Sequence, residues 1–400
     1  MALLYLRSPD AGPVDGVFVD RCIHVEEVPL AVPDASAVSW RSRARWTLGL
    51  LRGLPPWAFD CRSDAFRERL ASLAADWQPD VVEMHLVVMA QYHQALADCK
   101  AARILVDYDP PSAWAAELVR EARGLRRLAR RVELAAWRGY ERRTRRRFDA
   151  IVVFAERDRT AISATAPGVQ TVTIPLAFDI PPTALDPLGS SPPTVLFVGA
   201  FGHPPNVDAA RWLAGSIFPR VLEHVPDAQL QLVGDRPGSE VLRLAGDAVA
   251  VYGSVPDVTP YLDRAAVVVA PIRLGGSMRG KVLEALAAGK ALVATPRAAE
   301  GLEAVPGEHF LLASGEAELV DAIAHLLVDS PRRADLARRA RAWASENLSW
   351  DRSVHQFERL YAALLRSDDA VSSVAAAPPA RAAVPPSPPS REERRSRPSP

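Results

Sequence analysis

The chain has 400 residues, of which 48% are hydrophobic, and its equal numbers of basic and acidic residues give a formal net charge of zero. This length allows two domains of ordinary size, and the zero net charge excludes a global field that would attract nucleic acid or membrane. The chain has three cysteines, Cys22, Cys61 and Cys99, an odd number without the spacing of metal ligands. This favours reduced thiols in a cytoplasmic protein. We expect no transmembrane helix, because no apolar run reaches about 18 residues, and no signal peptide, because the start of the chain is too short and too weakly basic.

The first half of the chain alternates short apolar runs with helical patterns, which is typical of a parallel α/β domain. Strands are predicted at residues 2–6, 17–30, 80–85, 102–107, 149–154 and 169–174, and helices at 40–76, 91–99 and 112–148. We expect these elements to form one domain over residues 1–180.

A dense basic run lies in the long helix predicted over residues 112–148. Between Arg120 and Arg147 there are twelve arginines against three glutamates, with leucine, valine, tryptophan and tyrosine interleaved. One interpretation is an ordinary solvated helix face. The other is a surface for anionic lipid or a lipid-phosphate acceptor, which would place the protein peripherally at the inner face of a membrane. Nucleic acid is a weaker candidate, because no recognised nucleic-acid motif accompanies the run.

A second βα series follows a linker over residues 181–193 that is rich in proline, glycine and serine. Its first three strands, at 195–198, 228–233 and 249–252, are each followed by a glycine, and Asn206 is predicted to cap the first helix. Two such series predict doubly wound parallel sheets with a cleft between them. We expect the second domain over residues 194–349, a further helix over 350–366, and a disordered tail rich in alanine, proline, serine and arginine over 367–400.

The stretch over residues 271–289 holds the candidate chemistry. An apolar strand precedes a glycine loop (Gly275, Gly276, Ser277), and a helix then carries Arg279, Lys281 and Glu284 and ends at Gly289, a predicted left-handed cap. This order brings a helix N-terminus, where backbone N–H groups bind anions, to the carboxyl edge of a sheet. Lys281 and Glu284 share one face, so a cation for phosphate lies beside a carboxylate for hydroxyls, as a sugar nucleotide requires. The plain alternative is a crossover helix with one surface ion pair.

Several short motifs follow one another through the second half. They occupy residues 197–199, 205–208, 232–234, 253–257, 270–271, 281–289 and 295–302. Over roughly residues 194–315 their order and spacing resemble the family 4 glycosyltransferases, and look closest to bacterial members that make exopolysaccharide or related cell-surface glycans. The resemblance implies the GT-B fold, in which two Rossmann-like domains face a cleft.

The resemblance also implies a reaction and roles for particular residues. The reaction is retaining transfer of a sugar from a nucleotide sugar, such as a UDP- or GDP-sugar, to a glycan or lipid-linked acceptor, without a metal or a separate cofactor. Glu284 would bind the ribose hydroxyls and Lys281 would reach the diphosphate, with Gly199 and Gly234 on the nucleotide side of the site. Two positions depart from the family pattern: Gly276 replaces a glutamate and Ala200 replaces a phosphate-binding arginine.

The first half is more weakly similar to the acceptor-side domain of the same enzymes. Residues 80–85 match the strand that ends in a functional histidine near the donor sugar, so His85 is a catalytic candidate; the alternative is a polar residue with an ordinary hydrogen bond. His203 is expected to be structural, with a smaller role at phosphate as the alternative. The last helix is expected to cross back onto the first domain and to bury Trp350, Phe357, Leu360 and Tyr361.

The first domain is expected to lack its opening βα unit. No helical pattern follows the strand at 2–6, the segments 17–20 and 23–28 read as extended chain, and Pro29 and Pro33 block a helix. This leaves three functions open. They are an active sugar transferase, a non-catalytic subunit that binds nucleotide sugar, and a UDP-sugar 2-epimerase on the same fold.

Overall fold

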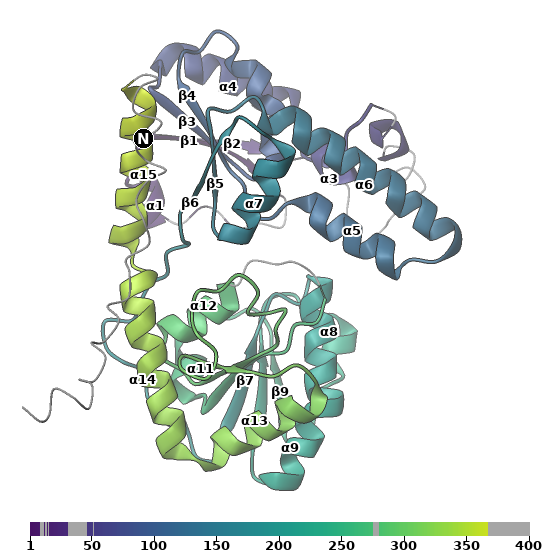
Figure 1. Ribbon diagram of the computed structural model, residues 1–400, viewed down its shortest axis with the longest axis vertical. Helices are drawn as coiled ribbons and strands as arrows, with labels where there is room; N and C mark the ends of the chain where they lie inside the picture. The colour runs from purple at the N-terminus through teal and green to yellow at the C-terminus, as the bar shows by residue number, and fades with distance from the viewer. Residues whose placement is uncertain are drawn as a thin grey trace, which may run out of the picture.

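The computed structural model describes residues 1–8, 12, 14, 16–30, 46–50, 52–274 and 280–366. Within these residues the strands form sheets in which every pairing between named strands is parallel, with helices packed around them in two units (Figure 1). The Gly275, Gly276, Ser277 and Arg279 predictions and the predicted disorder of the tail lie outside the described residues. No helix in the described part of the chain is long and apolar enough to span a bilayer.

The main sheet of the first unit has the strand order β3-β4-β5-β6. Its strands are β3 (Val81–His85), β4 (Ala102–Val106), β5 (Ala150–Val153) and β6 (Gln170–Thr173). A two-stranded sheet pairs β1 (Ala2–Arg7) with β2 (His24–Pro29), and Leu4, Leu6 and Val28 pack into the same core as the inner face of the main sheet. Because the main strands are parallel, their carboxyl ends meet at one edge of the sheet.

The helices of this unit cover the sheet and project from it. They are α1 (Gly16–Val19), α3 (Pro56–Asp60), α4 (Asp64–Trp77), the 3₁₀ helix η1 (Val87–Leu96), α5 (Pro111–Glu121), α6 (Gly124–Arg145) and α7 (Glu156–Thr165). In Figure 1, α5 and α6 lie side by side and extend away from the sheet.

Four sequence predictions for this unit are wrong in detail. The helix predicted over 40–76 is divided, in its described part, into a helical segment at 46–50, α3 and α4. The strand predicted over 17–30 begins only at His24, after the short helix α1, and the helix predicted at 91–99 is a 3₁₀ helix that begins at Val87. The single helix predicted over 112–148 is divided into α5 and α6. Gly124 has a φ of +56°, a left-handed conformation that glycine adopts without a steric penalty, and the chain reverses there.

The absent opening βα unit stays a prediction. Between β1 and β2 the described residues hold a helix of four residues, α1, where extended chain was predicted. The long helix that follows a first strand in a complete unit is not seen among them.

The second unit has a six-stranded sheet with the order β12-β11-β10-β7-β8-β9. The strands are β7 (Thr194–Val198), β8 (Gln229–Val233), β9 (Val249–Tyr252), β10 (Val267–Ala270), β11 (Leu292–Ala294) and β12 (Leu311–Leu312). Its helices are α8 (Pro204–Trp212), the π-helix η2 (Leu213–Ile217), α9 (Phe218–His224), α10 (Ser239–Leu242), α11 (Thr259–Arg264), α12 (Gly280–Ala287) and α13 (Glu316–Val328). The central strands are buried on both faces, which explains their nearly continuous apolar sequence.

Two helices connect the units along one side of the molecule. α14 (Ser330–Asn347) lies beside the second unit, and α15 (Trp350–Leu365) continues from it along the first (Figure 1). Leu360 is buried against Ile104, Val106 and Val152 on the outer face of the main sheet, with Phe357 and Tyr361 packed beside it. The predicted burial of Trp350 is wrong: its side chain is 56% exposed, and its indole N–H donates to Asp179 at 2.7 Å.

Candidate functional site

The loop after β7 is folded tightly against the start of α8. Pro204 occupies the first helical turn, where a missing N–H costs nothing, so α8 begins after His203. Asn206 is not the cap that the sequence predicted. Its buried side chain lies within the helix and donates to the backbone oxygen of Ala200 at 2.9 Å, which fixes the loop above the helix N-terminus.

Gly199 and Gly234 meet where β7 and β8 end. A Cβ atom at Gly234 would lie 2.0 Å from the backbone oxygen of Gly199, and one at Gly199 would lie 3.0 Å from Asn206 Cγ. Gly234 therefore excludes a larger residue for reasons of space, and a side chain at Gly199 would require Asn206 to shift. Both glycines lie at the carboxyl edge of the sheet, where α/β folds bind ligands.

Lys281 and Glu284 lie on α12, as the sequence predicts, and both are half-buried. Burial lowers the pKa of the Lys281 ammonium and raises the pKa of the Glu284 carboxyl, and the charge of each group opposes this shift in the other. Burial removes water from both charged groups, and the opposite charge of the partner offsets only part of the cost. They are suited to an incoming anion and to hydroxyl groups, respectively.

His203 lies close enough to Lys281 for the lysine to affect its titration. Burial, and then the positive charge of Lys281, lower the pKa of the His203 imidazole. The start of α8 and the start of α12 therefore present two nitrogen groups to one region. The sequence placed His203 in a separate loop and could not show this proximity.

Arg273 lies between β10 and the glycine loop, and it links this segment to α8. Its guanidinium makes two hydrogen bonds to Asp208, at 2.7 and 2.9 Å, and lies 4.8 Å from the centre of the Trp212 ring. Such a paired and stacked guanidinium has a fixed orientation. The chain segment after β10 is thus held against the helix that carries His203 at its N-terminus. The glycine cap predicted at the other end of α12 is confirmed, since Gly289 has a φ of +66°.

His85 lies at the carboxyl end of β3, on the outer face of the main sheet. Its side chain is 52% exposed, with Nδ1 3.2 Å from the Tyr108 hydroxyl and Nε2 3.4 Å from Glu83. Tyr361 of α15 donates to the other oxygen of Glu83 at 2.6 Å. His85 is therefore oriented at the edge of the first unit, and no contact within the described ranges joins it to Lys281 or Glu284.

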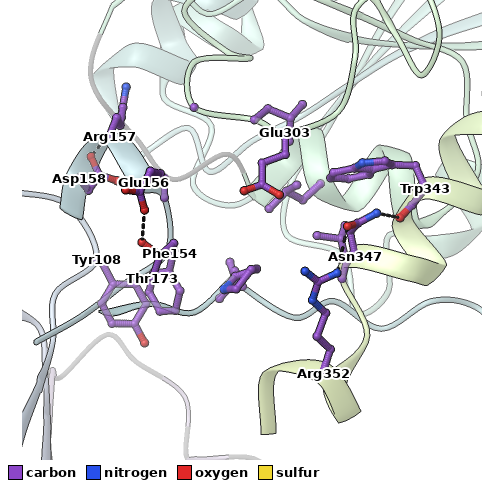
Figure 2. Close-up of a pocket in the computed structure, with 17 residues that line it drawn as sticks. Tyr108, Phe154, Glu156, Arg157, Asp158, Thr173, Glu303, Trp343, Asn347 and Arg352 are labelled. Carbon is purple, nitrogen blue, oxygen red and sulfur yellow. Dashed lines mark hydrogen bonds and ion pairs between the residues drawn. The ribbon is translucent and has the colours of Figure 1, made fainter. Parts of the chain in front are cut away.

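A pocket lies between the two units, beside this edge. It is lined by Tyr108, Phe154, Ala155, Glu156, Arg157, Asp158, Thr173, Pro175 and Leu176 from one side and by Leu283, Gly301, Leu302, Glu303, Trp343, Asn347, Leu348 and Arg352 from the other. Figure 2 shows the Glu303 carboxylate pointing into the space opposite Tyr108. Leu283 connects the pocket to α12, next to Glu284. Tyr108 was not predicted from the sequence, although its place directly after a predicted strand was a usable signal, and neither were Glu303 and Trp343, which have no such signal.

Ion pairs join the two units beside this pocket. Arg157 of α7 pairs with Glu300 at 2.6 Å, and Arg297 pairs with Glu117 of α5. These contacts hold the carboxyl edges of the two sheets towards each other, as a site shared by both units requires.

Comparisons with known proteins agree with this geometry. Residues 192–329 match the family model described as Glycosyl transferases group 1. No curated protein sequence matches the chain. Among solved structures, sucrose-phosphate synthase from Thermosynechococcus elongatus has 16% identity and a TM-score of 0.63, with 92% of this chain and 99% of that chain covered.

Two further structures were solved with ligands. Anabaena Alr3699/HepE in complex with UDP and glucose has 14% identity and a TM-score of 0.62, covering 90% of this chain and 99% of that one. A trehalose-6-phosphate protein from E. coli, bound with UDP-2-fluoro glucose, has 14% identity and a TM-score of 0.57, covering 92% of this chain and 100% of that one. The chain therefore has the GT-B fold, with two Rossmann-like domains, and its residues 192–329 match the glycosyl transferases of group 1.

Proposed function

We propose that this protein is a retaining family 4 glycosyltransferase that moves a sugar from a UDP- or GDP-sugar to a glycan or lipid-linked acceptor in cell-surface polysaccharide synthesis. The observation that carries the proposal is the convergence of His203, at the start of α8, with Lys281 on α12, three residues before Glu284. The ligands named for the structures of HepE and the E. coli protein, UDP with glucose and UDP-2-fluoro glucose, support a UDP-sugar as the first donor to test.

The roles follow from charge and position. Lys281, with Arg279 and the N-terminus of α12, would balance the charge that develops on the diphosphate as the bond to the anomeric carbon breaks. Glu284 would accept hydrogen bonds from the ribose hydroxyls. His85, held by Tyr108 and Glu83, would act from the first unit at the donor sugar, where an acceptor hydroxyl attacks the face that the diphosphate leaves.

The location of the enzyme is part of the proposal. We place it in the cytoplasm, peripherally at the inner face of a membrane, with the segment between Arg120 and Arg147 as its contact. A lipid-linked acceptor would be delivered at that surface.

A binding screen tests the proposed site. UDP, GDP and their sugars are added to the wild-type protein and thermal unfolding is followed. A ligand at 100 times its Kd adds about 2.7 kcal/mol to the free energy of unfolding, so at least one nucleotide sugar is expected to raise Tm. The absence of a shift with every nucleotide would contradict the proposal.

The same screen has an expected pH dependence. In the free protein the pKa of His203 lies below its ordinary value, so the imidazole is neutral at neutral pH. A bound diphosphate favours the protonated form and raises this pKa, so binding takes up a proton and weakens as the pH rises through the bound-state pKa. A nucleotide sugar has no phosphate proton that titrates in this range, so His203→Asn should flatten the dependence. An equal slope in the variant would remove His203 from the site.

A further inference from the structure

The arginine-rich segment has two parts with different surroundings. In the inner part, Arg145 is buried with Asp107 and Glu141, and Arg143 donates to the backbone oxygen of Gly53 at 2.7 Å. These side chains belong to the internal structure of the first domain. In the outer part, residues 123–132, which form the start of α6, every residue is exposed.

The outer part is amphipathic, with an apolar stripe on one side and arginines around the rest of the helix. Leu125, Leu128 and Val132 are 86%, 59% and 49% exposed, and their spacing of three and four residues places them on one side of the helix. Residues 123–132 also hold five arginines, which lie about 90° or more round the helix from this stripe, and no acidic residue. The first acidic residue beyond Val132 is Glu133, which is paired with Arg130 at 2.7 Å.

The charge decides which occupant fits. A second copy packed on the apolar stripe would cover the leucines but would leave the arginine side of the helix without a counter-charge. Anionic lipid headgroups supply the missing negative charge to the long arginine side chains, and the acyl boundary accepts the three aliphatic side chains. We infer that residues 123–132 of α6 dock on an anionic bilayer, with Leu125, Leu128 and Val132 entering its interfacial region.

This surface is mechanically connected to the edge of the sheet. α6 has 22 residues and is therefore about 33 Å long. At its far end Arg145 is joined to Asp107, which directly follows β4 and precedes the pocket residue Tyr108. Docking at the outer end would thus fix the position of the interdomain pocket relative to the membrane. The inference narrows the proposed membrane contact to one part of α6, and it does not depend on any nucleotide chemistry.

Vesicle co-sedimentation tests the inference with the full chain. Vesicles of phosphatidylcholine alone and of phosphatidylcholine mixed with phosphatidylglycerol are compared at low and at high salt. The wild type is expected to sediment with the anionic vesicles at low salt only. Replacing Arg126, Arg127 and Arg131 by Gln is expected to reduce binding about tenfold or more, because lipid attraction falls with each arginine removed.

Two further variants make the test specific. Leu125→Ser with Leu128→Ser keeps the charge and should also reduce binding, which a purely electrostatic contact would not show. The matched control replaces three exposed arginines of the second domain, Arg243, Arg338 and Arg339, by Gln and should bind as the wild type does. All the substituted side chains are exposed, so thermal unfolding should be unchanged.

Four outcomes would overturn the inference. They are no binding to anionic vesicles at low salt, equal loss in the control, unchanged binding of both α6 variants, and a wild-type dimer that the leucine variant dissociates while neither protein binds vesicles. Because none of these readouts requires a donor sugar, failure here is distinct from failure of the proposed transferase function.

Discussion

Replacing Lys281 by Ala is expected to lower kcat/KM for the nucleotide-sugar donor by about 10²–10³-fold, because one preorganised group that stabilises developing charge contributes roughly this much. Lys281 is half-buried on α12, and burial lowers the pKa of its ammonium, which shows that its charge is incompletely solvated. A diphosphate that gains negative charge as the sugar departs would interact with this ammonium more strongly than the ground state does.

The control for this prediction is Lys100→Ala, which removes an exposed lysine from the first domain. Steady-state kinetics of nucleoside diphosphate release, together with thermal unfolding, separate a catalytic effect from a folding defect. Unchanged kcat/KM in a folded Lys281→Ala protein would refute the assignment of the diphosphate to α12.

Replacing Arg145 by Met is expected to reduce the free energy of unfolding by about 3–5 kcal/mol, the cost of leaving buried charge unpaired. Arg145, Asp107 and Glu141 are each 1% exposed, and the guanidinium lies 2.8 Å from Asp107 and 3.1 Å from Glu141. Glu141 also accepts hydrogen bonds from the backbone N–H and the hydroxyl of Ser112 at 2.8 and 2.7 Å. The substitution removes the positive charge from this network and leaves both carboxylates in place.

The expected loss depends on pH in a defined direction. Burial already raises the pKa of Glu141, and the charge of Arg145 opposes that shift. Without Arg145 the pKa rises further, so the folded variant binds a proton more tightly than the unfolded chain. Its stability is therefore expected to fall as the pH rises above the ordinary pKa of a glutamate and through the folded pKa of Glu141, so that it is lower at about pH 8 than at about pH 5.

Urea unfolding at these two pH values measures the effect, with Arg142→Met as the exposed control on the same helix, expected to change stability by no more than about 0.5 kcal/mol. If Arg145→Met does not fold, Arg145→Met with Glu141→Gln should recover part of the loss by removing one unpaired charge. A single variant as stable as the control would show that the buried network contributes nothing to the fold.

The parts of the fold that sequence predicted well are those that a short window specifies. The apolar run before the glycine loop becomes β10, and the left-handed cap at Gly289 is present. Lys281 and Glu284 lie three residues apart on α12, so their shared face followed directly from helix geometry. His85 was likewise placed correctly at a strand end, while its catalytic role stays a prediction.

The errors occur where one residue or a distant partner overrides the local pattern. Gly124 is surrounded by good helix formers, yet its left-handed conformation divides the predicted helix. Pro204 sets the start of α8 earlier than Asn206 would. Trp350 looked like a core residue, but in the first turn of α15 its indole reaches Asp179 and the ring stays exposed.

The arrangement of the site required the structure for a different reason. Tyr108, Glu303 and Trp343 line one pocket from positions far apart in the chain, so no local spacing connects them. The proximity of His203 to Lys281 depends on the order of β7 and β10 in the sheet, where the two strands are neighbours although they are about 70 residues apart in the chain.

Product analysis is the measurement that tests the central claim most directly. The wild-type protein is incubated with the nucleotide sugar that stabilises it most and with glycan and lipid-linked acceptors, and the products are followed by NMR. We expect release of nucleoside diphosphate in step with a new glycosidic bond that keeps the anomeric configuration of the donor. Donor that stays intact with every acceptor would indicate a binding subunit, and donor inverted at C2 without an acceptor would indicate an epimerase; either result would contradict the proposed transferase.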